Sequence, residues 1–183
     1  MPLHTWTFPN SGDCILANAR VPACLTDARD LPVGPDGLLD TDILVRAGHI
    51  AALAAPGTLG AASPVVDCSQ GIALPRLVDL HTHLDKGQIW PRRANPDGTH
   101  DGARTSVMAD REANWSAPDV RARMDFALRC AFAHGTAAVR THIDSLGKQA
   151  AISWPVFEEM REAWKGRIAL QAVALRCCCG ART

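Results

Sequence analysis

The sequence has no net charge and no long apolar run. Its 19 basic and 19 acidic residues balance, so the chain as a whole exerts no long-range attraction on polyanions. No stretch approaches the roughly 18 apolar residues that cross a bilayer. The first 13 residues also lack the basic segment and apolar run of a secretory signal. We therefore expect a cytoplasmic protein that binds neither nucleic acid nor membrane.

Paired cysteine spacings are missing as well. Cys14, Cys24, Cys68 and Cys130 form no Cys-x-x-Cys pair, so we expect them to be small buried apolar residues. The remaining cysteines, 177–179, are adjacent. Neighbouring thiolates of an extended chain point in different directions, which disfavours a shared tetrahedral ion.

Residues 1–70 have a β pattern. Short apolar runs are separated by clusters of proline and glycine, and Ala47-Gly48 suits a tight hairpin turn. We expect an N-terminal β-sandwich segment with strands at 14–19, 42–46, 49–53 and 65–67.

Residues 71–175 alternate between strand and helix patterns, which predicts an α/β fold with parallel strands. The expected strands are 72–80, buried on both faces, then 136–141 and 168–175. One helix is expected from the N-cap Ser116 to Gly135, and another from the N-cap Ser153 to Gly166. A polar loop is expected at 86–115. Residues 176–183 fit no element and are interpreted as an aberrant tail.

Two histidines end the first strand of this α/β region. Side chains at i and i+2 of a strand leave the same face, so His81 and His83 can direct both imidazoles to one point. Neutral imidazole is a good ligand for zinc or ferrous iron. The spacing predicts two ligands of a metal site, and such a site usually needs a third protein ligand.

Other polar residues follow the ends of the same strands. Asp85 either supports the site through a hydrogen bond or begins a turn, and Lys86 faces either the pocket or solvent. His142 and Asp144 follow the second strand and either line the site or have structural roles. Trp90, in the long loop, either covers a planar substrate or is solvated.

The order of these motifs resembles the amidohydrolase superfamily, and within it the cytosine deaminases. The resemblance rests on Asp79-Leu80-His81-Thr82-His83, on the following Leu84-Asp85-Lys86, and on Arg140-Thr141-His142-Ile143-Asp144. It extends over residues 14–175. The resemblance implies a (β/α)₈ barrel whose catalytic residues lie at the carboxyl ends of its strands. About three of the eight strands are present here.

The resemblance also implies a reaction. One divalent ion, Fe²⁺ or Zn²⁺, is held by His81 and His83 together with a histidine and an aspartate of later strands. A glutamate of a later strand moves the proton, and a small heterocyclic amine such as cytosine yields uracil and ammonia. Full-length relatives are expected to be homo-oligomers.

The later ligands and the glutamate have no counterparts in this sequence, and a whole barrel needs about 250 residues. We therefore expect a truncated N-terminal portion, produced by a frame change or gene truncation, with negligible activity by itself. The alternatives are another superfamily C–N hydrolase, acting on an aminotriazine, an imidazolone or an N-substituted amide, and a non-catalytic binding or assembly fragment. The zinc nucleobase deaminases are excluded because His-x-Glu and Pro-Cys-x-x-Cys are both absent.

Overall fold

The computed structural model describes residues 7–9, 12–60, 63–145 and 147–175. The chain divides into two compact units, Met1–Pro75 and Arg76–Thr183. The predictions for the tail at 176–183, including its three cysteines, concern residues outside the described part.

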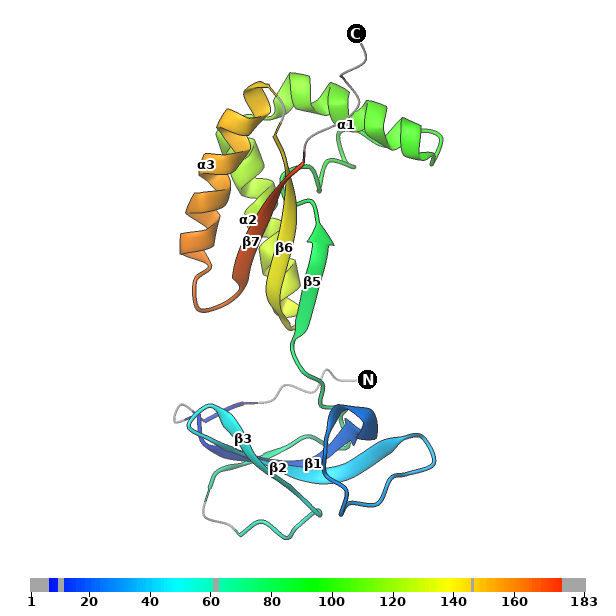
Figure 1. Cartoon of the computed structure of the whole chain (residues 1–183), viewed down its shortest axis with the longest axis vertical. Coiled ribbons are helices and arrows are strands. Elements are labelled where there is room, and N and C mark those ends of the chain that lie inside the picture. Colours follow the sequence, from blue (N-terminus) through cyan, green and yellow to red (C-terminus); the bar gives the residue numbers. More distant parts are fainter. Residues whose placement is uncertain (1–6, 10–11, 61–62, 146, 176–183) are drawn as a thin grey trace. The chain divides into compact units, whose positions relative to one another are not determined.

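The N-terminal unit contains one four-stranded sheet with the order β3-β2-β1-β4 (Figure 1). Its strands are β1 (Cys14–Pro22), β2 (Leu38–Arg46), β3 (His49–Ala54) and β4 (Val65–Asp67), and a short 3₁₀ helix, η1 (Ala23–Leu25), follows β1. All four expected strands are present. The Ala47-Gly48 turn has φ angles of 49° and 76°, which are typical of the hairpin turn that was predicted.

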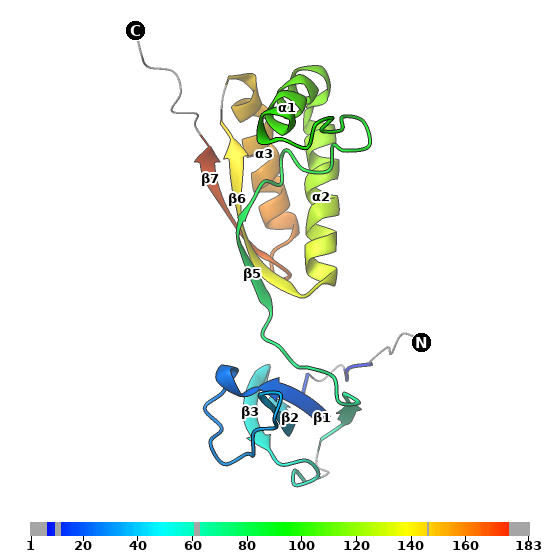
Figure 2. The same ribbon diagram turned by 90° about the vertical axis from the view of Figure 1, so that its right-hand side faces the viewer.

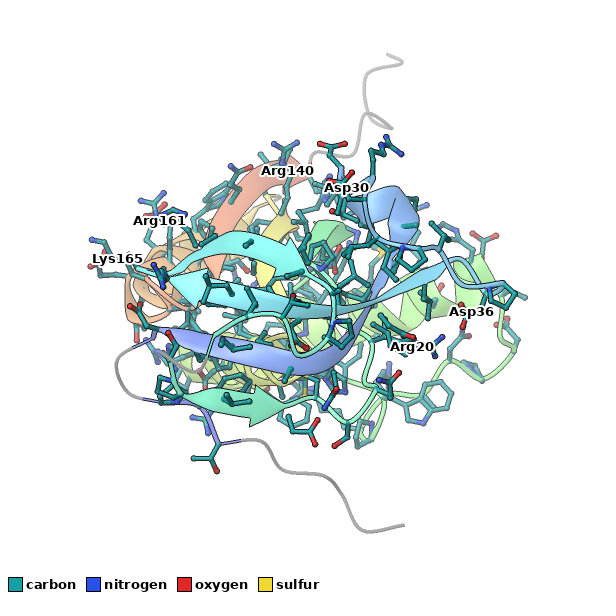
Figure 3. All side chains as sticks on the ribbon, turned by 90° about the horizontal axis from the view of Figure 1, so that it is seen from below. Arg20, Asp30, Asp36, Arg140, Arg161 and Lys165 are labelled. Carbon is teal, nitrogen blue, oxygen red and sulfur yellow. The ribbon has the colours of Figure 1, made fainter. Side chains whose placement is uncertain are left out.

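Asp42 on β2 connects β1 and the loop after β3 through hydrogen bonds. Its buried carboxylate accepts hydrogen bonds from the backbone nitrogens of Asn18, at 2.9 Å, and Gly57, at 2.8 Å. Asn18 has a φ of 54° where the β1–β2 register shifts, so the carboxylate satisfies an amide that the irregular ladder leaves over. At the surface, Arg20 on β1 forms an ion pair with Asp36 (Figure 3).

The C-terminal unit is an α/β structure, as predicted. Its sheet has the order β5-β6-β7, with both strand pairs parallel. The strands are β5 (Leu77–Thr82), β6 (Thr136–Asp144) and β7 (Ala169–Leu175), and the helices are α1 (His100–Asn114), α2 (Ala117–Ala133) and α3 (Lys148–Ala163). Helices α2 and α3 cover one face of the sheet, and α1 lies across the carboxyl ends of the strands (Figures 1 and 2).

The core lies between this sheet and its two helices. Met124 and Leu128 of α2, Phe157 of α3 and Ile143 of β6 are at most 2% exposed and pack together. The other face of the sheet carries no helix of the described part of the C-terminal unit (Figure 2). The sheet also exposes apolar side chains: Leu77, Val78, Leu80 and Val173.

The prediction that 72–80 forms one strand buried on both faces was wrong. Ile72 pairs with Arg20 of the N-terminal unit, and β5 begins only after Pro75. Every residue of β5 except Thr82 is exposed, because β5 is an edge strand of a three-stranded sheet with one open face.

The helix boundaries agree in part with the sequence. Ser116 caps α2 as predicted, since its hydroxyl accepts a hydrogen bond from the backbone nitrogen of Asp119. Helix α3 begins at Lys148, so the predicted cap Ser153 lies inside it and accepts a hydrogen bond from Gln149. The predicted loop 86–115 contains α1.

The four scattered cysteines were predicted to be buried, and only Cys14 is. Cys68 and Cys130 are half-buried. Cys24 is exposed because η1, which carries it, has no buried residue. Within the described ranges, no helix combines the length and the apolar character required to cross a membrane.

Candidate metal site

Three imidazoles meet at the carboxyl ends of β5 and β6. His81 is in β5, His83 follows it after one residue, and His142 is near the end of β6. The ring centres of His81 and His83 are 5.4 Å apart, and those of His83 and His142 are 5.5 Å apart. His81 and His142 are closer, at 4.2 Å, with their planes tilted by 32°. Residues 59 or more positions apart therefore share one site.

The paired histidines fit a shared divalent ion. Zinc–nitrogen distances of about 2.0 to 2.1 Å place the centres of two imidazoles on one tetrahedral ion roughly 5 Å apart. The pair His81 and His83 has this spacing. The Nδ1 atoms of His83 and His142 are buried without a hydrogen-bond partner among the described residues, which leaves nitrogen donors available.

The fit covers only part of a metal site. In the part of the chain that the structure describes, no group of three or more histidine, cysteine, aspartate or glutamate side chains is arranged to hold a metal ion. His142 packs on the ring of His81 at a distance shorter than two ligands of one tetrahedral ion would have. Among the described residues, His81 and His83 have the spacing expected of two ligands of one ion, and their role as metal ligands stays a prediction.

The surroundings of His83 favour the neutral, metal-binding form of its ring. Burial lowers the pKa of His83, and the positive charge of Lys86 lowers it further. A hydrogen bond with the backbone of His142 opposes both effects. Because only a neutral imidazole binds a metal, the net lowering of the pKa of His83 is compatible with its predicted role as a ligand.

Asp85 is fully buried in the turn after the paired histidines. Its Oδ2 atom accepts a hydrogen bond of 2.8 Å from the backbone nitrogen of Asp144. Burial raises the pKa of Asp85 to about 6, and this hydrogen bond lowers it in part. The sequence left two roles open for Asp85, a supporting hydrogen bond and the start of a turn. In the structure, its carboxylate accepts a hydrogen bond that joins the turn after β5 to the end of β6.

Lys86 and Asp144 form an ion pair beside the histidines. The Nζ atom of Lys86 lies 3.0 Å from Oδ1 of Asp144. Arg111 of α1 approaches the other carboxylate oxygen at 3.5 Å. All three side chains are at most 22% exposed, so the group brings charges of both signs to the edge of the site.

Trp90 lies apart from this group of residues. Its side chain is 66% exposed, and no hydrogen bond or ring contact of the described residues joins it to the histidines. Its neighbour Arg92 has a structural role, because its guanidinium pairs with Asp110 of α1 and Asp119 of α2.

Sequence reasoning missed Arg111 and Thr141 as neighbours of the site. Arg111 was assigned to a loop, and only the recognition of α1 would have placed it near Asp144. Thr141 accepts a hydrogen bond from the backbone nitrogen of Leu84. Its place one residue before His142, on the strand that ends at the site, was the available signal.

Comparison with a known protein supports the resemblance that the sequence suggested. A pterin deaminase of Rhizobium rhizogenes is 53% identical over 167 residues, which cover 91% of this chain. No protein-family model matches the chain. The resemblance to the amidohydrolase superfamily is confirmed. The chain spans 38% of the length of that relative, so its similarity is to one part of that protein.

Two solved amidohydrolases agree on the fold. The crystal structure of 5-methylcytosine deaminase from Klebsiella pneumoniae, liganded with 5-fluorocytosine, matches with a TM-score of 0.64 and 22% identity, over 88% of this chain and 36% of that chain. N-isopropylammelide isopropylaminohydrolase from Burkholderia multivorans matches with a TM-score of 0.61 and 25% identity, over 89% of this chain and 37% of that chain. The α/β unit is thus a partial (β/α) barrel, as predicted.

Proposed function

We propose that this chain provides the first two metal ligands of a hydrolytic deaminase that removes an exocyclic amine from a nitrogen heterocycle. The observation that carries the proposal is the pair His81 and His83, whose ring centres lie 5.4 Å apart at the carboxyl end of β5. The 53% identity to a protein named pterin deaminase supports the reaction class. It also favours a pterin over cytosine as the ring that is attacked.

The residues of this chain would bind and orient the reacting groups. The lowered pKa of His83 keeps its ring neutral, so it can bind the ion without first losing a proton. When bound, Fe²⁺ or Zn²⁺ would lower the pKa of a water ligand toward neutrality and so supply the hydroxide that attacks the ring carbon. Lys86 and Asp144 lie where they could contact polar atoms of the heterocycle.

The proton-transfer group and the remaining ligands would come from a longer polypeptide. For that reason we expect the 183-residue chain alone to release negligible ammonia from pterin or cytosine. A direct test joins residues 1–175 to the remainder of the Rhizobium pterin deaminase. We expect the metal-loaded chimera to release ammonia from pterin.

Two variants of this chimera make the test specific. His83→Ala should remove the activity and reduce the metal content, whereas Trp90→Ala, at an exposed position outside the site, should keep both. A chimera that folds and retains metal but releases no ammonia from pterin or cytosine would refute the proposal.

A second candidate is the hydrolysis of an N-substituted amine. The likeness to N-isopropylammelide isopropylaminohydrolase, with a TM-score of 0.61 at 25% identity, supports it. The two candidates differ in the product, because this reaction releases an alkylamine in place of ammonia. Mass spectrometry of the amine released by the chimera from pterin and from N-isopropylammelide separates them.

A further inference from the structure

Besides the ion pair of Lys86 with Asp144, two hydrogen bonds with backbone donors attach the turn at residues 84–87, which follows the paired histidines, to β6. The backbone nitrogen of Leu84 donates to Oγ1 of Thr141, at 2.9 Å. The backbone nitrogen of Asp144 donates to Oδ2 of Asp85, at 2.8 Å. Thr141 and Asp85 are both fully buried, so these contacts are shielded from water. These two hydrogen bonds therefore hold Leu84 and Asp85 of the turn in place against β6.

Helix α2 holds the same turn from the other side. The Nη1 atom of Arg123 donates to the backbone oxygens of Asp85, at 2.5 Å, and Gly87, at 3.0 Å. Arg123 is itself fixed, because its Nε donates to Asp119 and its guanidinium stacks on the ring of Trp115. The side chain of Arg123 is only 7% exposed. Its charge is thus used to fix the path of the backbone.

Among these contacts, the one that uses a buried carboxylate is that of Asp85 with the backbone nitrogen of Asp144 on β6. A buried carboxylate is costly unless the protein compensates it, so a residue with a smaller polar group would cap a turn at lower cost. What the carboxylate provides is a fixed spacing between the ends of β5 and β6. Those ends carry His83 on one side and His142 on the other, with ring centres 5.5 Å apart.

We propose that Asp85 is a positioning residue for the metal site. By binding the backbone nitrogen of Asp144, it fixes the orientation of the His83 ring relative to His142. The value of this orientation for metal binding rests on the proposed function. The orientation itself does not, and the two can be measured separately.

The test uses the 183-residue chain and four variants. Asp85→Ala removes the acceptor, Asp85→Asn keeps an acceptor oxygen, and Thr141→Val removes the neighbouring hydrogen bond with little change of shape. Asp42→Ala is the matched control, because Asp42 is also a buried aspartate that accepts backbone hydrogen bonds, but in the N-terminal unit. NMR signals of the imidazole nitrogens report ring environment, and competition with a chelator reports affinity for Zn²⁺.

We expect Asp85→Ala to shift the imidazole signals of His83 and His142 and to weaken Zn²⁺ binding about tenfold or more, as loss of a supporting contact does in other metal sites. Asp85→Asn should restore part of both properties, and Thr141→Val should shift the same signals by less. Asp42→Ala should lower the melting temperature and leave the signals of both rings unchanged.

Two results would overturn the inference. One is a folded Asp85→Ala variant with unchanged imidazole signals. If Asp85→Ala does not fold, the deciding result is that Asp85→Asn and Thr141→Val both fold and leave the imidazole signals unchanged. If the unmodified chain binds no Zn²⁺, the proposed metal ligands are wrong, and the imidazole signals still decide the positioning role.

Discussion

Strands β5 and β6 are neighbours in one sheet but differ in how they are held. Five of the nine residues of β6 are buried and only Arg140 is exposed, whereas β5 is exposed at every residue except Thr82. Both strands nevertheless deliver histidines to the same point. An exposed strand can hold a side chain in place because the turn that follows it is hydrogen-bonded to its better-packed neighbour.

The largest expected effect compares the packing of the two strands directly. Ile143 of β6 is fully buried, and Leu80 of β5 is 67% exposed. Ile143→Ala should lower the free energy of unfolding by about 2 to 5 kcal/mol, because it leaves a cavity in the core. Leu80→Ala should change it by less than about 0.5 kcal/mol. Urea denaturation of both variants measures the difference, and equal effects would show that β5 is packed as β6 is.

Acid should lower the free energy of unfolding by a smaller amount. It should act first on α1, in the segment between β5 and α2. Burial alone would raise the pKa of Asp110, but hydrogen bonds from Arg92, Trp115 and Asn114 lower it to about 2. A carboxylate with a lowered pKa stabilises the fold above its ordinary pKa near 4, and this contribution is lost as the pH falls toward 2. The loss is at most about 2 kcal/mol, because the partner Arg92 is partly exposed.

Hydrogen exchange between pH 4 and pH 2 can locate this loss. We expect the amides of α1 to lose protection while those of β6 and α3 keep theirs. In Asp110→Asn, protection of α1 should already be reduced at pH 6. If β6 loses protection at a higher pH than α1, acid does not act first on α1 and the prediction is wrong.

The smallest effect on stability concerns β5, the exposed edge strand. Leu80→Lys and Val78→Lys place charges on exposed positions of β5, so each should change the free energy of unfolding by less than about 0.5 kcal/mol. Both should reduce self-association, because an exposed apolar edge strand promotes it. Sedimentation velocity over a range of concentrations measures this, with Ile50→Lys, at an exposed position of the N-terminal unit, as the control. An equal reduction in the control would show that β5 has no special role in self-association.

Elements held by apolar packing were predictable from the sequence, and elements held by polar contacts were not. Helix α2 combines a serine cap with apolar residues at helical spacing, and both signals were correct. The buried residues of α1 are Ser106 and Asp110, so its inward face has no apolar pattern to detect. Helix α3 begins after Gly147, which makes no side-chain cap, and therefore its N-cap was placed six residues too late, at Ser153.

The candidate site divides in the same way. The i, i+2 rule for strands was sufficient to pair His81 with His83. The approach of His142 depends on the parallel register of β5 and β6, which local patterns do not specify. Arg111 reaches Asp144 only because α1 crosses the strand ends, and that crossing depends on ion pairs between residues far apart in the sequence.

Arg92 has a consequence for the order in which the chain folds. Its partners Asp110 and Asp119 lie 18 and 27 residues away and belong to two different helices. The ion pairs can therefore form only after both helices exist and have met, and loops of this length must close first. Arg92→Ala should speed unfolding and leave the folding rate nearly unchanged. This arginine would then slow the unfolding of the folded chain.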